Sequence, residues 1–151
     1  MMLAGQNTLV FEIGRNDFAT GVTGAQHYAN IVTYLSEATN GVLAKGWQAR
    51  IMANIATAPS LQGEVDVLRA LIRAPAFLTD CQAGPGQVYD GQLAVIDTDL
   101  IEHGGGPVFA SSDDTLDQAY YDTDRTHPTI LGAEVRVTGG DTPARGIGAN
   151  L

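Results

Sequence analysis

The chain is poor in basic residues, and Lys45 is its only lysine. Eight basic residues stand against 17 acidic ones, so the formal net charge is −9 at pH 7. A protein that binds nucleic acid needs a basic patch to meet the phosphates, and none is visible here. The composition therefore predicts no nucleic-acid partner.

Cysteine is also scarce, since Cys81 is the only one, and an internal disulfide is therefore excluded. We interpret Cys81 as a buried, inert thiol, which leaves the cellular compartment open. No stretch is long and apolar enough to span a membrane, so we expect no membrane partner. The N-terminus lacks a basic segment and Glu12 interrupts its apolar run, so no signal peptide is predicted.

What is present suits one folded domain: 151 residues, of which 44% are hydrophobic and 17% charged, with 18 glycines to make turns. Short apolar runs bounded by turn residues predict strands, and apolar residues at helical spacing predict helices. We expect strands at 8–13, 48–56 and 93–97, and helices at 25–38, from a Ser60 cap to before Pro75, and from Pro128 to Gly139 or Gly140. The remainder is expected to be a glycine-rich loop over 14–24, a polar loop over 98–126 and a C-terminal tail over 139–151.

This order of elements, β-α-β-α-β-loop-α, is typical of an α/β protein with a parallel sheet and helices on both faces. In such sheets functional residues gather where the strands end. Gly14, Asn16 and Asp17 follow the first predicted strand directly. Their position marks them as candidate site residues.

The first motif is Gly14-Arg15-Asn16-Asp17. An amide side chain held on a tight turn beside a strand end is a fixed hydrogen-bond donor that can point at an oxyanion. The alternative is that Asn16 and Asp17 only cap the loop through their own backbone.

The second motif places Asp124 three residues before His127, with Pro128 following. A carboxylate at this spacing can reach the imidazole Nδ1–H, which fixes the tautomer and stabilises the imidazolium formed during proton transfer. The alternative is an exposed loop histidine beside an unrelated aspartate.

Together the two motifs resemble the SGNH (GDSL-type) hydrolase family. That family has a flavodoxin-like three-layer α/β/α sandwich, a Gly-x-Asn-Asp block after a central strand, and an Asp-x-x-His block near its C-terminus. The resemblance implies an ester hydrolase in which Asn16 donates to an oxyanion, His127 is the general base and Asp124 orients it. It also implies a small acyl ester or acetylated carbohydrate as substrate, and no metal or cofactor.

The family's Gly-Asp-Ser block, which carries the nucleophile, normally precedes Gly-x-Asn-Asp by several dozen residues. Here thirteen residues precede Gly14, so the resemblance covers the C-terminal part of such a domain, over 1–138, without its first strands. An incomplete sheet exposes an unpaired strand edge. We therefore expect a homo-oligomer, a complementing chain, or a gap filled by residues Val135 to Thr138.

The nucleophile is not identified by a Gly-Asp-Ser motif in this chain. Ser111 and Ser112 precede the Asp-His block in the long loop. Gly140-Asp141-Thr142 resembles the nucleophile block with threonine in place of serine, so a circularly permuted enzyme would use Thr142. The plainer interpretation of that segment is a helix C-cap followed by a flexible tail.

Two other features carry less weight. The "HGGG" segment, 103–106, is interpreted as a flexible loop, because no Gly-x-Ser-x-Gly elbow accompanies it. Asp97, Asp99, Glu102 and His103 match no metal-site spacing and are interpreted as a solvated acidic loop. A different class of function also stays open: a catalytically inactive SGNH-like module used for assembly, as in a virion, or for carbohydrate binding.

Overall fold

The sheet at the centre of the molecule is short and parallel. The computed structural model describes residues 7–12, 15–53, 58–82, 91–111, 113–124 and 127–151. Strands β1 (Thr8–Phe11), β2 (Gln48–Met52) and β3 (Leu93–Ile96) pair in that order, and both pairings are parallel. The prediction of an α/β protein with a parallel sheet is confirmed, and β1 and β3 form the two edges of this sheet among the described strands.

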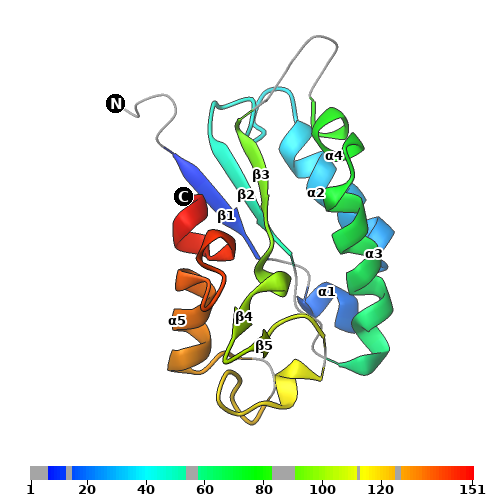
Figure 1. Cartoon of the computed structure of the whole chain (residues 1–151). Helices are drawn as coiled ribbons and strands as arrows, with labels where there is room; N and C mark the ends of the chain where they lie inside the picture. Colours follow the sequence, from blue (N-terminus) through cyan, green and yellow to red (C-terminus); the bar gives the residue numbers. More distant parts are fainter. Residues whose placement is uncertain (1–6, 13–14, 54–57, 83–90, 112, 125–126) are drawn as a thin grey trace.

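One face of the sheet carries the main core. Helices α2 (Gly24–Ser36), α3 (Gln62–Arg73) and α4 (Ala76–Asp80) lie on that side, as Figure 1 shows. Side chains alternate along a strand, so every second residue faces these helices. The resulting cluster includes Phe11, Ile51 and Val95 from the sheet.

The opposite face is more polar and lies toward the C-terminal part of the chain. Helix α5 (Ile130–Thr138) and two 3-10 turns, Pro143–Arg145 and Ile147–Asn150, run along that side (Figure 1). Arg50 of β2 donates from Nε to the carbonyl of Asn150 at 2.8 Å. The predicted C-terminal tail, 139–151, therefore contains two 3-10 turns and contacts the sheet. Residues Val135 to Thr138 are helical, so they do not fill a strand gap.

Helix boundaries follow the sequence pattern closely in two cases. Thr23 caps α2 by accepting a hydrogen bond from the backbone N–H of Gln26, and α3 ends at Arg73, before Pro75, as predicted. The predicted Ser60 cap is wrong, because a 3-10 turn over Pro59–Leu61 precedes α3, which has no side-chain cap.

The two predicted loops contain structure that the sequence analysis missed. The segment 14–24 holds a short helix, α1 (Arg15–Ala19), and the segment 98–126 holds a hairpin of β4 (Glu102–His103) and β5 (Gly106–Pro107). The "HGGG" segment is the turn of that hairpin, with positive φ at both Gly104 and Gly105.

The last helix begins two residues later than predicted. Thr129 caps α5, so Pro128 lies before the helix instead of in its first turn. Gly139, with φ of +85°, ends the helix as predicted, because a left-handed residue there lets its N–H reach the carbonyl of Val135. None of the described helices is both long and apolar enough to cross a membrane.

Cys81 is fully buried, which agrees with its interpretation as an inert thiol. Burial, with the nearby charge of Asp80 as a second cause, raises the pKa of Cys81 from 9.0 to about 12. We expect the native protein to react with a disulfide reagent at mildly alkaline pH about a thousandfold more slowly than the unfolded chain, because less thiolate is present. Timing the release of thionitrobenzoate with and without denaturant measures this, and equal rates would contradict the burial.

Candidate functional site

The Asp124–His127 pair forms as predicted. The carboxylate Oδ2 of Asp124 lies 2.5 Å from Nδ1 of His127, and its Oδ1 accepts the backbone N–H of His127 at 2.9 Å. Both carboxylate oxygens thus bind one residue, which fixes the ring's orientation. With Nδ1 engaged by the carboxylate, Nε2 is the ring nitrogen left for proton transfer.

The loop that carries this pair is closed at its base by backbone hydrogen bonds. Tyr121 and Pro128 form an antiparallel bridge, the N–H of Asp122 donates to the carbonyl of His127 at 2.8 Å, and the N–H of Thr129 donates to that of Tyr120 at 3.0 Å. The His127 side chain is nevertheless 75% exposed. The pair is therefore ordered in orientation and open to a ligand from outside.

The start of α5 packs so tightly against this base that its third residue must be glycine. A Cβ at Gly132 would lie 2.0 Å from the carbonyl oxygen of Tyr120. We expect Gly132→Ala to destabilise the protein by about 1–3 kcal/mol, through displacement of α5 from Tyr120. Urea denaturation measures the change, and Gly63→Ala is the control, because a Cβ at this exposed helical glycine meets nothing within 4 Å. Equal midpoints for the two variants would contradict the close contact.

The first motif lies at the end of β1, and Asn16 falls within α1. Gly14 lies outside the described residues. The carboxylate of Asp17 pairs with Nδ1 of His27 at 3.4 Å, and His27 is 1% exposed on α2. His27 was not among the predicted site residues, although it falls four residues before the buried Ile31 and so lies on the helix's core-facing stripe.

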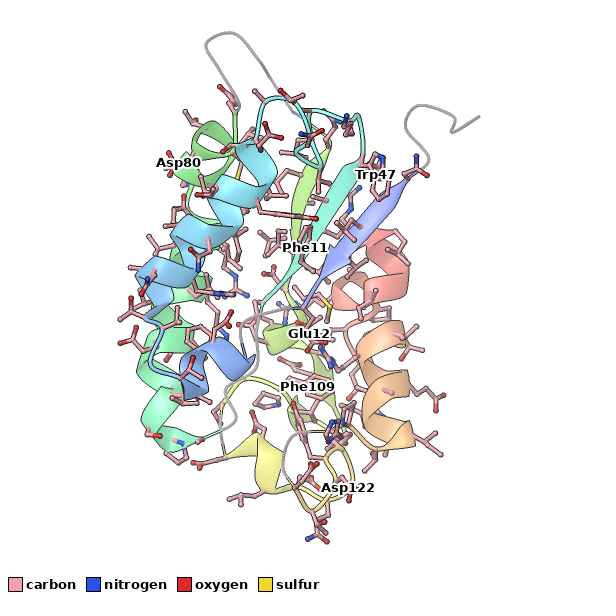
Figure 2. All side chains as sticks on the ribbon, turned by 180° about the vertical axis from the view of Figure 1, so that it is seen from behind. Phe11, Glu12, Trp47, Asp80, Phe109 and Asp122 are labelled. Atoms are coloured by element: carbon pink, nitrogen blue, oxygen red, sulfur yellow. The ribbon has the colours of Figure 1, made fainter. Side chains whose placement is uncertain are left out.

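Both motifs lie beyond the edge of the sheet that is formed by the carboxyl ends of the strands. Figure 1 places α1 there, and Figure 2 shows Asp122, next to the Asp-His pair, further out than Glu12 and Phe109. This is where functional residues of parallel sheets gather.

The Gly140-Asp141-Thr142 segment holds the β4–β5 hairpin. The hydroxyl of Thr142 donates to the carbonyl of Gly139 at 3.0 Å and accepts from the N–H of Glu102 at 3.1 Å. The carboxylate of Asp141 accepts from the N–H of Gly105 at 3.3 Å. These polar groups therefore serve as a clamp on the hairpin.

The remaining nucleophile candidates are the loop serines. The Oγ of Ser111 lies 3.4 Å from Oδ2 of Asp114, and its N–H donates to the same oxygen at 2.7 Å. Ser112 lies outside the described residues. Among the residues that the structure describes, no hydroxyl is hydrogen-bonded to His127.

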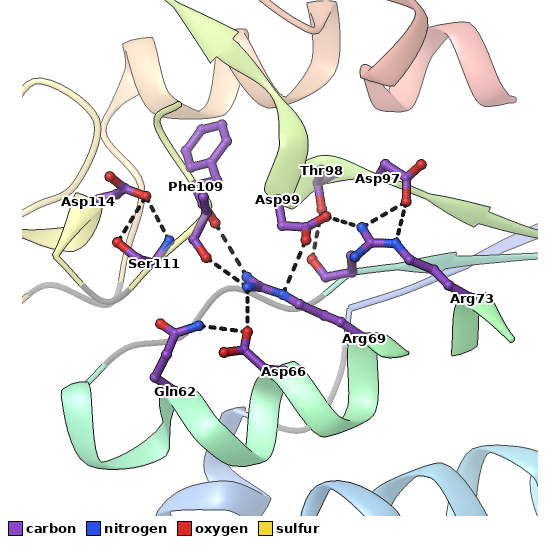
Figure 3. A network of polar contacts seen from close by, with 12 residues as sticks. Gln62, Asp66, Arg69, Arg73, Asp97, Thr98, Asp99, Phe109, Ser111 and Asp114 are labelled. Atoms are coloured by element: carbon purple, nitrogen blue, oxygen red, sulfur yellow. Dashed lines mark hydrogen bonds and ion pairs between the residues drawn. The ribbon is translucent and has the colours of Figure 1, made fainter. Parts of the chain in front are cut away.

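The acidic residues after β3 form ion pairs with α3, shown in Figure 3. Asp97 and Asp99 both bind the guanidinium of Arg73, and Asp99 also lies 3.4 Å from Nε of Arg69. Asp99 is 3% exposed, so the interpretation of a solvated acidic loop is wrong for this residue. Burial lowers the pKa of Arg73, but its hydrogen bonds to Asp99 and Asp97 outweigh this and raise the pKa overall.

The other members of that predicted cluster lie elsewhere. Nδ1 of His103 is 2.7 Å from the hydroxyl of Tyr120, and Glu102 is exposed on β4. In the described part of the chain, no group of three or more histidine, cysteine, aspartate or glutamate side chains is arranged to hold a metal ion.

No protein-family model, curated protein or solved structure matches this chain. The two motifs and the geometry around them are therefore the features that indicate a function.

Proposed function

We propose that the chain is the acid–base portion of an SGNH-type carboxylic-ester hydrolase. The observation that carries this proposal is the two-point contact between Asp124 and His127, with Nδ1 engaged at 2.5 Å. That contact holds the ring as a general base with Nε2 available. Asn16, at the carboxyl end of β1, is proposed as a donor to the oxyanion.

The proposed chemistry is acyl transfer through a covalent intermediate. A serine hydroxyl adds to the ester carbonyl while Nε2 of His127 takes its proton, and Asp124 stabilises the imidazolium. The imidazolium then protonates the leaving alcohol, and water releases the acyl group by the same route in reverse. The exposure of His127 suits a small acyl or acetyl ester on a bulky alcohol such as a carbohydrate.

The serine is proposed to come from a further strand that joins the outer edge of β1 and belongs to a complementing chain. That edge is available among the described strands, since β1 pairs with β2 alone. Such a strand would extend the sheet toward the flavodoxin-like three-layer arrangement. It would also satisfy the unpaired backbone groups along β1.

The test is hydrolysis of p-nitrophenyl acetate by the chain alone and by the chain co-expressed with a strand segment that carries Gly-Asp-Ser. A rate that requires both the segment and His127 supports the complemented enzyme. A His127-dependent rate of the chain alone, abolished by Thr142→Ala, supports the permuted enzyme instead. No His127-dependent rate in either preparation rejects a hydrolase.

A binding module without catalysis is the second candidate. The observation that favours it is the engagement of the Thr142 and Ser111 hydroxyls in local contacts away from His127. Calorimetry with an acetylated oligosaccharide separates the two, because a module of this kind retains the ligand unchanged.

A further inference from the structure

One ion pair joins the segment that precedes the first motif to the helix that follows the second motif. Glu12 directly follows β1, and Arg136 lies in the last turn of α5. Nη2 of Arg136 donates to Oε1 of Glu12, across 124 residues of sequence. Glu12 stands just before the Gly-Arg-Asn-Asp motif, and α5 directly follows the loop with Asp124 and His127.

Arg136 connects this ion pair to the core beneath the Asp-His loop. Its guanidinium carbon lies 5.9 Å from the centroid of the Phe109 ring, and Phe109 is fully buried. Arg69 fixes the same segment from α3, because its guanidinium donates to the carbonyls of Ala110 at 2.7 Å and Phe109 at 3.4 Å (Figure 3). Phe109 is thus held in place from two sides.

The base of the loop that carries the Asp-His pair packs against the ring of Phe109. Phe109 makes edge-on contacts with Tyr120 and Tyr121, at centroid distances of 6.3 and 6.0 Å. These two tyrosines form the loop's base with Pro128 and Thr129. A continuous set of contacts therefore runs from Glu12 through Arg136 and Phe109 to the base of the Asp-His loop.

The ion pair is asymmetric in a way that favours a positioning role. Arg136 is 9% exposed, its Nε has no hydrogen-bond partner among the described residues, and the Glu12 side chain is 46% exposed. Without the carboxylate, a nearly buried cation loses its anionic partner, which is costly enough that its side chain and α5 are expected to shift toward solvent.

We propose that Glu12 and Arg136 are positioning residues that set the placement of the Asp124–His127 pair relative to the Asn16 turn. Their role in catalysis rests on the proposed function, but their role in spacing the two motifs does not.

The experiment uses the full chain with Ala19→Cys, at the exposed end of α1, labelled with a nitroxide. Cys81 stays unlabelled because it is buried. Paramagnetic broadening of the amide signals of His127 and α5 reports their distance from α1. We expect Glu12→Gln to change this broadening. Glu12→Asp keeps the charge, so its broadening should stay close to that of the wild-type protein.

Asp80→Asn is the matched control, because it changes a carboxylate that links α2 to α4 through Tyr28 at 2.5 Å and touches neither motif. Unchanged broadening in Glu12→Gln, or an equal change in Asp80→Asn, overturns the proposal. In an active preparation, Glu12→Gln should also lower kcat by about 10- to 100-fold with little change in KM. If no preparation is active, the hydrolase proposal fails while the broadening still decides the positioning role.

Discussion

Replacing His127 by alanine is expected to lower the esterase kcat of the complemented protein by about 10⁶-fold, the size of effect seen when a catalytic triad loses its base. The reason is that Nε2 is the proposed acceptor of the nucleophile's proton, while Asp124 holds Nδ1 at 2.5 Å. Asp124→Asn is expected to lower kcat by about 10⁴-fold, since an amide presents the wrong partner to Nδ1 and favours the wrong tautomer. Initial rates with p-nitrophenyl acetate measure both effects.

Asp122→Asn is the matched control for these variants. Asp122 lies in the same loop and is exposed, but its carboxylate accepts the N–H of Thr123 at 2.7 Å and does not contact His127. It should keep the wild-type rate. If Asp122→Asn loses as much activity as Asp124→Asn, the loss reflects the loop's net charge or folding, and the assigned role of Asp124 is wrong.

Arg69→Met is expected to produce the largest loss of stability, about 3–5 kcal/mol, which is a large part of the 5–15 kcal/mol typical of a domain. The Arg69 side chain is 7% exposed and lies within 3.4 Å of Asp99, whose own side chain is 5% exposed. Removing the guanidinium leaves a buried carboxylate short of one cation, and the Ala110 and Phe109 carbonyls lose their donor. The free energy of unfolding in urea measures the change.

Arg73→Met is the comparison for this prediction. Arg73 is one turn further along the same helix and also binds Asp99, but its side chain is 32% exposed. Its loss should cost about 1 kcal/mol, because water replaces part of the interaction and Arg69 still neutralises Asp99. Equal losses from the two substitutions would show that burial of Arg69 is not what makes it important.

Local pattern alone was enough to place several elements. The stripe of Ile31 and Leu35 predicted α2, and Pro75 marked the end of α3, because each signal acts over one or two turns of helix. The hairpin in the long loop was missed, since its two-residue strands are too short to show any alternation. Helix α1 was missed for a similar reason, because five residues do not establish a helical period.

The Asp124–His127 pair could be predicted from the amino-acid sequence, because a separation of three residues within one loop lets the carboxylate reach both the ring and the backbone of His127. Three other contacts could not be predicted without the three-dimensional structure: Asp99 is buried against Arg69, Thr142 binds the backbone of the β4–β5 hairpin, and Glu12 pairs with Arg136. Those contacts join residues that are distant in sequence, and they depend on how α3 and α5 pack against the sheet.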